Sequence, residues 1–346
     1  MTLLHSLRQL SVRQSAIIAG AAGLAVLAGA NRAVARRAER RHPPEGRFIE
    51  VDGVRLHYTD RGTGRPVVLI HGNAVLGHDY DTSGVAESLI RTNRVIIFDR
   101  PGFGHSERPR GRAWTAAQQA KLLHKAFTML HIRRPVIVGH SWGTLVALAL
   151  ALALDHPADT AGLLLLSGYY FPTLRLDAPL VAPVATPVLG DLLRYTVSPL
   201  LGWLMMPAFK RMLFAPARMS ARFKAEYSPA MALRPSQIRA TAMDGALMVP
   251  SVLGPSWRYG GLAMPVVIMA GDGDKVVSDR QAKRLHAAIP GSILHIVEGA
   301  GHMVPHIAVR EVLEVVADVV QRSGGDVSTN RLVKPEPSKG RASKAA

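Results

Sequence analysis

The sequence predicts an α/β fold: an eight-stranded, mostly parallel sheet with helices on both faces, plus a helical cap insertion. Three observations predict it. From residue 47 onward, short β-branched runs alternate with helical stretches, which is typical of a parallel sheet covered by helices. Most of these runs are continuously apolar, as strands buried on both faces require. The alternation is broken once, over residues 168–260, where no good strand pattern is found.

The first two predicted strands form a hairpin. "RFIEV" (47–51) and "VRLHYTD" (54–60) flank Asp52-Gly53, a dipeptide typical of two-residue turns, so these strands should be antiparallel. Further strands are predicted at 66–70, 94–98, 135–139, 162–166, 265–270 and 292–297, and helices at 115–130, 142–155, 279–289 and 308–321. Because crossovers between parallel strands are right-handed, the loops that follow the strands should gather along one edge of the sheet.

The insertion of residues 168–260 separates two parts of the predicted core, 47–167 and 261–321. It is rich in Pro, Leu and Met. We expect a helical cap over the carboxyl edge of the sheet; the alternative is a decorative helical layer. Its methionine and aromatic side chains favour an apolar substrate pocket, although such a set in a helical segment is more often plain packing.

The composition is that of a globular protein with basic ends. Of 346 residues, 48% are hydrophobic and 19% are charged, and the absence of cysteine excludes disulfides, thiolate metal sites and cysteine nucleophiles. The net charge is +17, to which residues 1–47 contribute +6 and residues 322–346 contribute +4. Because the sequence shows no arginine–aromatic interleaving and no nucleic-acid motif, we expect no nucleic-acid partner.

The N-terminal segment, residues 1–46, contains the apolar run "AIIAGAAGLAVLAGA" (16–30) bracketed by arginines. At about 1.5 Å per residue this run reaches about 22 Å, short of the roughly 30 Å hydrocarbon core unless flanking residues extend it. Since five arginines follow the run, we expect a membrane anchor with a cytoplasmic catalytic domain. The alternatives are a signal peptide cleaved near Ala28-Gly29-Ala30 before export, and a helix that lies on a surface or is soluble. The basic tail, residues 322–346, lacks an apolar period and is expected to be disordered.

The pentapeptide "GHSWG" (139–143) lies between a predicted strand and a predicted helix. Gly-x-Ser-x-Gly at such a junction fits a sharp, strained turn that presents the serine hydroxyl, here that of Ser141. The helix behind it directs free N–H groups and the positive end of its dipole toward developing negative charge. The backbone N–H of Trp142 is therefore a predicted oxyanion donor.

A serine nucleophile needs a base and a carboxylate that orients the base, and the loops after the last two strands supply both. "GDGDKVVS" begins at residue 271 and "EGAGHMVPH" at residue 298. We predict His302 as the base, with His306 as the alternative, and Asp274 as the acid, with Asp272 as the alternative. His302 and His306 stand four apart without a third ligand, so we expect no metal. Hydrolysis through an acyl-enzyme needs no cofactor.

From about Phe48 to Gln321 the chain resembles the α/β-hydrolase fold superfamily. The resemblance rests on "HGN" (71–73), "FDRPGFGHS" (98–106), "GHSWG", and "GDGDKVV" followed by "GAGH". It implies that the aspartate of "GxxDxVV", here Asp274, is the acid. It also implies that the backbone N–H after "HG", that of Asn73, is the second oxyanion donor. Relatives that open epoxides or displace halide carry aspartate where this chain has Ser141, so those activities are not expected.

Three other features are interpreted as structural. "FDRPGFGHS" resembles a structural loop of the family in which Gly102 and Gly104 permit tight turns, and we assign it no chemistry. His140 is adjacent to the nucleophile, but neighbouring side chains on such a turn diverge. His71 is interpreted in the same way.

These features together predict a serine hydrolase that cleaves small, hydrophobic carboxylic esters or related acyl compounds. Activity should fall as the pH drops through roughly 6 to 7, where an imidazole base becomes protonated. Alternatives on the same triad are haloperoxidase-like peracid formation, carbon–carbon bond hydrolysis and lyase chemistry, because fold and triad do not fix the reaction. A non-catalytic protein that binds a ligand under the cap is the remaining alternative.

Overall fold

The computed structural model describes residues 11–152, 160–173 and 178–324. The predicted eight-stranded sheet is confirmed, in the order β1-β2-β4-β3-β5-β6-β7-β8. β1 and β2 pair antiparallel across the Asp52-Gly53 turn, β2 is antiparallel to β4, and all other pairs are parallel. The strands are β1 (Arg47–Val51), β2 (Val54–Arg61), β3 (Arg65–Ile70), β4 (Asn93–Phe98), β5 (Val136–His140), β6 (Gly162–Leu166), β7 (Val266–Gly271) and β8 (Ile293–Val297).

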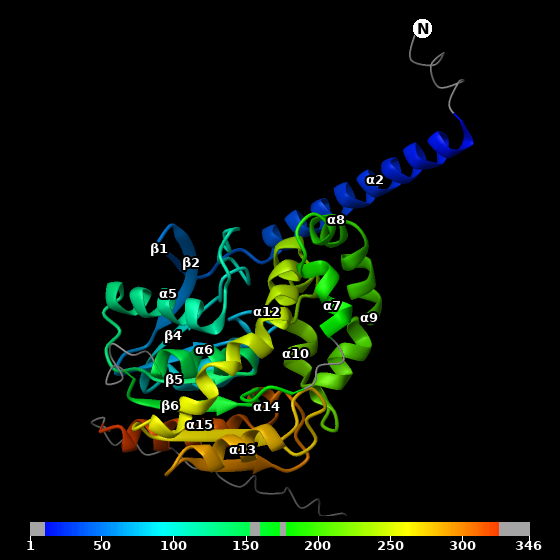
Figure 1. Ribbon diagram of the computed structural model, residues 1–346. Helices are drawn as coiled ribbons and strands as arrows, with labels where there is room; N and C mark the ends of the chain where they lie inside the picture. Colours follow the sequence, from blue (N-terminus) through cyan, green and yellow to red (C-terminus); the bar gives the residue numbers. More distant parts are fainter. Residues whose placement is uncertain (1–10, 153–159, 174–177, 325–346) are drawn as a thin grey trace, which may run out of the picture.

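Helices pack on both faces of the sheet (Figure 1). One apolar cluster joins the sheet to α5, α6 and α13, and the opposite cluster joins it to α4 and α15. Their apolar side chains are at most 9% exposed, so the central strands are buried on both faces as their continuous apolar sequences require. The helices are α3 (Asp79–Thr82), α4 (Val85–Leu89), α5 (Ala116–Met129), α6 (Trp142–Ala151), α13 (Arg280–Ala288), α14 (Val304–Ile307) and α15 (Val309–Arg322).

Two predictions extend beyond the described residues. The helix predicted at 142–155 is observed as α6 up to Ala151, and residues 153–159 lie outside the described part of the chain. The tail predicted to be disordered begins at the end of α15, and residues 325–346 likewise lie outside it.

Between β6 and β7 the described chain is helical, and we call residues 178–261 the cap segment. Its helices gather beside one edge of the sheet (Figure 1). This segment contacts the core through α12, which packs near α6, and through α10 and η3, which contact α3 and α13. Its elements are α7 (Ala178–Ala185), α8 (Leu189–Tyr195), α9 (Val197–Phe214), α10 (Ala221–Glu226), α11 (Pro229–Ala232), α12 (Pro235–Leu253) and a 3₁₀ helix, η3 (Pro255–Gly261).

The N-terminal apolar run belongs to a longer helix, α2 (Val12–Arg41), which projects from the body (Figure 1). A capping box begins it: Gln14 N donates to Ser11 Oγ, and Ser11 N donates to Gln14 Oε1. Thirty residues span about 45 Å, enough to cross a hydrocarbon core. The flanking arginines and alanines are good helix formers, which is why the helix continues beyond the apolar run. Within the described residues, α2 is the one helix long and apolar enough to cross a membrane.

Candidate active site

Ser141 occupies the turn between β5 and α6. Its backbone has φ 51° and ψ −120°, a conformation that non-glycine residues rarely adopt. A Cβ atom on Gly143 would collide with the carbonyl oxygens of Ile70 and His71, and one on Gly139 would lie 2.8 Å from the Gly143 oxygen. The two glycines of "GHSWG" are therefore needed because β3, β5 and α6 approach closely around the serine.

The structure brings Ser141, His302 and Asp274 together. His302 Nε2 lies 2.8 Å from Ser141 Oγ, and His302 Nδ1 lies 2.7 Å from Asp274 Oδ2. The side chains of His302 and Asp274 are 4% and 0% exposed. Asp274 Oδ1 accepts hydrogen bonds from the backbone N–H groups of Val276 and Val277, which fix the carboxylate toward the imidazole. Loops after β5, β7 and β8 thus meet at one edge of the sheet.

The two alternative residues lie elsewhere. Asp272 Oδ1 accepts a hydrogen bond from Gly299 N and joins the loops that carry Asp274 and His302. His306 is buried against Asp79, with 3.0 Å between Nε2 and Oδ1. Burial raises the pKa of Asp79, but the charge of His306 and its hydrogen bond outweigh burial and lower that pKa. Within the described residues, neither group is recorded in a hydrogen bond to Ser141.

His140 and His71 make structural contacts. His140 Nε2 lies 3.0 Å from the backbone oxygen of His302, so a proton on Nε2 supports the loop that carries this imidazole. Burial, together with the charge of His302, lowers the pKa of His140 to about 4. His71 Nε2 accepts from Arg100 N, which leaves Nδ1 as the donor to the Gly72 oxygen. Burial and then the charge of Arg100 lower the pKa of His71 to about 3.

The segment that carries Asn73 lies against the serine turn. A Cβ atom on Gly72 would lie 3.0 Å from Ser141 Cβ, so the chain just before Asn73 passes directly over Ser141. Trp142 is the first residue of α6, so its backbone N–H has no acceptor within the helix. The Asn73 side chain is engaged elsewhere, because Nδ2 donates to the Thr241 oxygen of α12 at 3.1 Å.

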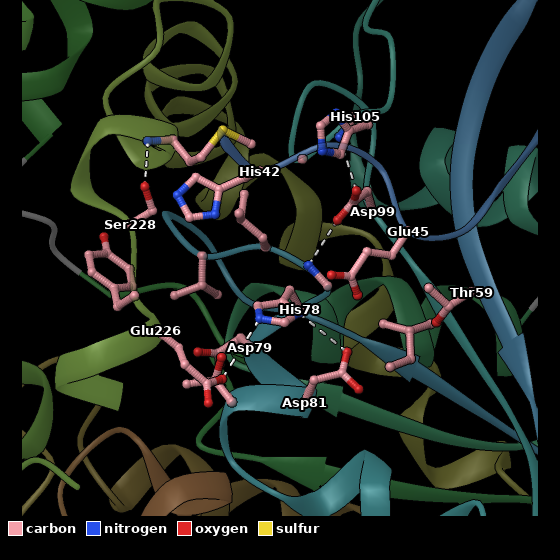
Figure 2. A pocket seen from close by; sticks show the side chains of 18 of the residues that line it. His42, Glu45, Thr59, His78, Asp79, Asp81, Asp99, His105, Glu226 and Ser228 are labelled. Atoms are coloured by element: carbon pink, nitrogen blue, oxygen red, sulfur yellow. Dashed lines mark hydrogen bonds and ion pairs between the residues drawn. The ribbon is translucent and has the colours of Figure 1, made fainter. Parts of the chain in front are cut away.

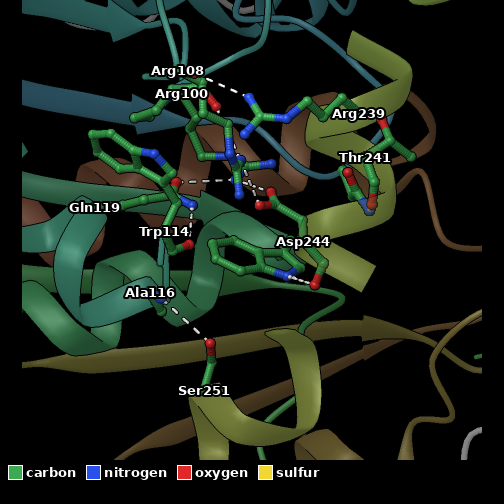
Figure 3. Close-up of polar contacts among 12 residues, drawn as sticks. Arg100, Arg108, Trp114, Ala116, Gln119, Arg239, Thr241, Asp244 and Ser251 are labelled. Atoms are coloured by element: carbon green, nitrogen blue, oxygen red, sulfur yellow. Dashed lines mark hydrogen bonds and ion pairs between the residues drawn. The ribbon is translucent and has the colours of Figure 1, made fainter. Parts of the chain in front are cut away.

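A buried charge cluster that the sequence does not reveal joins the segment that carries Asn73 to the cap segment (Figure 3). Arg100, in the "FDRPGFGHS" loop, donates to the backbone oxygens of His71 and Gly72, both at 2.9 Å. Its Nη1 also donates to Asp244 Oδ2 of α12 at 2.6 Å, with both side chains 0% exposed. Arg108 donates to the second carboxylate oxygen of Asp244 at 2.8 Å. One cap carboxylate therefore pairs with two arginines of the core.

The same cluster holds Trp142. Its Nε1 donates to the backbone oxygen of Asp244 at 2.9 Å, and the Arg100 guanidinium lies 4.7 Å from the centre of the indole ring. Arg100 thus contacts both segments that carry the predicted oxyanion donors. The available sequence signal was an aspartate within the otherwise apolar run "TAMDGALMV". A buried charge there needs a cationic partner, but the sequence does not say which arginine supplies it.

A cavity of about 180 Å³ opens near the end of α2, and Ser141, His302 and Asp274 are not among its lining residues (Figure 2). Several of its acidic side chains are already paired: Asp99 Oδ2 lies 2.7 Å from His57 Nδ1, and Asp81 pairs with Arg61. Burial raises the pKa of Asp99, but the hydrogen bond and charge of His57 outweigh it, and that pKa is lowered to about 2. We interpret these pairs as part of the framework that holds the loops around the cavity.

The "FDRPGFGHS" loop has the tight turns expected of it. Gly102 and Gly104 have φ values of 88° and 53°. Asp99 accepts hydrogen bonds from the backbone N–H groups of Gly77 and His105, and a Cβ atom on Gly104 would overlap its carboxylate. Only glycine fits at residue 104 for this reason.

Residues 65–307 match the family model for the alpha/beta hydrolase fold, and the chain belongs to this family. An esterase from Exiguobacterium antarcticum has the same fold, with a TM-score of 0.66 and 19% identity over 80% of this chain and 99% of that one.

Two curated relatives match part of the chain. The 2-hydroxymuconate semialdehyde hydrolase of Pseudomonas putida is 36% identical over 137 residues, which are 39% of this chain and 48% of that protein. Haloalkane dehalogenase 2 of Mycobacterium bovis is 31% identical over 139 residues, 40% of this chain and 47% of that protein. The matches span about half the length of these relatives.

Proposed function

We propose that the protein is a serine hydrolase that cleaves carboxylic esters or related acyl compounds through Ser141, His302 and Asp274. One observation carries the proposal: the His302 imidazole lies within hydrogen-bond distance of both Ser141 Oγ and the buried Asp274 carboxylate. A hydroxyl, an imidazole and a carboxylate in this order are the parts that activate a serine.

In the proposed reaction His302 Nε2 takes the Ser141 proton while Oγ attacks the substrate carbonyl. The backbone N–H groups of Asn73 and Trp142 stabilise the oxyanion, and the protonated His302 then passes its proton to the leaving alcohol. Asp274 keeps the other imidazole proton on Nδ1 and stabilises the imidazolium. Water attacks the acyl-enzyme with His302 as base, which releases the acid and restores Ser141.

A reactive phosphonate tests whether Ser141 is activated. We expect a fluorophosphonate probe to label the folded chain once per molecule, at Ser141 by peptide mapping. Labelling should disappear in Ser141→Ala and weaken strongly in His302→Ala. A folded protein that is not labelled would point instead to a non-catalytic ligand-binding protein, and labelling at another serine would refute the assignment.

A substrate panel tests the reaction class. p-Nitrophenyl esters of increasing acyl length should be hydrolysed, with kcat/KM rising toward longer acyl chains if the substrate is hydrophobic. Carbon–carbon bond hydrolysis is the second candidate, favoured by the 36% identity to 2-hydroxymuconate semialdehyde hydrolase. Labelling at Ser141 without ester hydrolysis, together with cleavage of 2-hydroxymuconate semialdehyde, would support that alternative.

A further inference from the structure

Helix α9 of the cap segment is apolar on two sides. Its inward side chains Met206, Leu213 and Phe214 are buried in the body. Its opposite side carries large apolar side chains that are 46–77% exposed, and we call them the outer face of α9: Leu200, Leu201, Trp203, Leu204 and Met205. Single exposed leucines are normal, but a contiguous group marks a surface that contacts another apolar phase. A helix that is apolar all round is typical of a buried or lipid-facing position.

The outer face begins where α2 meets the cap segment. Asn31 Nδ2 donates to the backbone oxygens of Tyr195 and Thr196, at 2.9 and 2.8 Å. Thr196 directly precedes α9, and Leu200 follows four residues later, about 6 Å along a helix axis. Figure 1 shows α2 leaving the body beside α8, on the side of the molecule that carries α9.

A second contact holds the C-terminal end of α2 to the cap segment. Glu39 Oε1 accepts a hydrogen bond from Arg234 Nη1 at 3.0 Å, and the Arg234 side chain is 4% exposed. Together with the Asn31 contacts, this bond makes the basic end of α2 part of the folded protein. These contacts fix the position of α9 relative to α2. If the apolar part of α2 enters a membrane, α9 therefore lies next to that membrane.

The apolar part of α2 is mostly uncovered by the rest of the protein, although residues between Ala21 and Gly29 line a pocket with α8. An 18-residue apolar window of this helix is 0% buried within the described structure. In both helices basic residues follow the apolar ones: Arg32, Arg36 and Arg37 in α2, which also has Arg13 before its apolar run, and Lys210 and Arg211 in α9. Basic side chains at the border of an apolar surface suit the headgroup region of an anionic bilayer.

From this continuity and charge pattern, we propose that the apolar part of α2 enters a lipid bilayer and that the outer face of α9 contacts the same bilayer. The cap segment is then a second membrane contact, placed beside the anchor. This proposal goes beyond the proposed hydrolase chemistry and does not depend on it, because it rests on exposure, on the α2 contacts and on the charge pattern alone.

Tryptophan fluorescence tests the contact directly, because Trp203 lies in the outer face. The full chain is reconstituted into phosphatidylcholine–phosphatidylglycerol vesicles, with or without bromine on the lipid acyl chains, a short-range quencher. Trp114 and Trp142 are buried in the protein, and Trp257 is 79% exposed on η3, outside the outer face, and serves as the matched control. We expect brominated lipid to quench wild type and Trp257→Phe, and Trp203→Phe to lose most of this quenching.

Several outcomes would overturn the proposal. Equal quenching in wild type and Trp203→Phe would place the lipid contact elsewhere. The same holds if the vesicle-bound chain shows no quenching, or if the full chain fails to float with the vesicles. If Trp203 is shielded from both brominated lipid and aqueous acrylamide, another protein surface, such as a second copy of the chain, covers the outer face.

A charge variant extends the test without removing the reporter. Leu204 is 77% exposed, so Leu204→Asp leaves the protein core intact while placing a carboxylate where lipid is proposed. In the Trp257→Phe background we expect Leu204→Asp to reduce quenching of Trp203, with an unchanged thermal unfolding midpoint in detergent. Unreduced quenching in this folded variant would contradict lipid contact at the outer face.

Discussion

The sheet core and the cap segment contribute to the candidate site in different ways. In the core, Ser141, Asp274 and His302 follow β5, β7 and β8, and the register of these parallel strands brings their loops to one edge. The cap segment reaches the same region through individual side chains, above all Asp244. Core geometry therefore follows from topology, whereas the cap contact combines apolar packing, for example of Met248 and Val252, with a few buried polar groups that single substitutions can disrupt.

The largest effect should come from the core, at Asp274. Its carboxylate accepts from His302 Nδ1, and an amide there would favour the wrong imidazole tautomer. We expect Asp274→Asn to lower kcat for an ester by about 10⁴-fold. Steady-state kinetics on p-nitrophenyl esters measure this, with a circular dichroism spectrum to confirm folding.

The matched control is Asp272→Asn, two residues away. Asp272 accepts a hydrogen bond from Gly299 N, whereas His302 is bonded to Asp274. We therefore expect Asp272→Asn to lower kcat by less than about 10-fold, which corresponds to the loss of one ordinary hydrogen bond. If Asp272→Asn were as damaging as Asp274→Asn, the assignment of the acid would be wrong.

The next effect concerns the cap contact, through two aspartates of the cap segment that both pair with arginines of the 100–110 loop. Asp244 is buried and contacts Arg100 and Arg108, whereas Asp191 is 31% exposed and pairs with the exposed Arg110 and with Arg194 of its own helix. Asp244→Asn leaves buried cations without their carboxylate and should lower the free energy of unfolding by about 3–5 kcal/mol. Asp191→Asn should cost about 0–1 kcal/mol. Urea denaturation of both variants measures the difference.

The kcat of Asp244→Asn tests whether the buried charge cluster also affects catalysis. Because Arg100 contacts the His71 and Gly72 oxygens next to Asn73, Asp244→Asn should also lower kcat for esters in the fraction that remains folded. A loss of one oxyanion donor corresponds to about 10²–10³-fold, which sets the upper limit. If kcat per labelled Ser141 were unchanged in Asp244→Asn, Arg100 would stabilise the fold without positioning the segment that carries the proposed oxyanion donor Asn73.

The difference between core and cap also explains what the sequence could predict. Apolar runs and the Asp52-Gly53 turn fix strand positions within one or two residues, and parallel topology then places Ser141, Asp274 and His302 near one another. The predicted site residues lie in loops whose position this topology determines. Arg100 and Asp244 are 144 positions apart, and their pairing depends on how α12 lies over the core, which no local pattern reveals. Helix α2 extends beyond the apolar run of residues 16–30 at both ends, because these ends are helical without being continuously apolar.

We expect the free energy of unfolding to fall in acid because His71 and His140 are buried in the core. Both are neutral and buried, with folded pKa values lowered to about 3 and about 4, whereas an exposed imidazole has a pKa of about 6.5. The unfolded chain therefore binds more protons below pH 6.5. Stability is fully present above pH 6.5 and is lost as the pH falls toward 4, at up to about 1.4 kcal/mol per pH unit for each group.

Urea midpoints at pH 7, 6 and 5 measure this slope, and His140→Gln isolates one group. The glutamine retains an N–H donor near the His302 oxygen but does not titrate. We expect His140→Gln to have a shallower decline of stability between pH 6 and pH 5 than the wild type. An identical decline in the two proteins would mean that other groups govern the loss in acid.

The smallest expected effects are those of two N-cap substitutions, which test whether the core and the cap segment unfold in one transition. Thr115 Oγ1 accepts from Gln118 N at the start of α5 in the core, and Ser220 Oγ accepts from Phe223 N at the start of α10 in the cap segment. Loss of either N-cap hydrogen bond costs about 1 kcal/mol. If the buried Asp244 cluster makes one cooperative unit, Thr115→Ala and Ser220→Ala should each shift the same urea transition by similar amounts. If the cap segment unfolds separately, Ser220→Ala shifts only an earlier transition, seen by Trp203 fluorescence, and leaves the later transition at its wild-type midpoint.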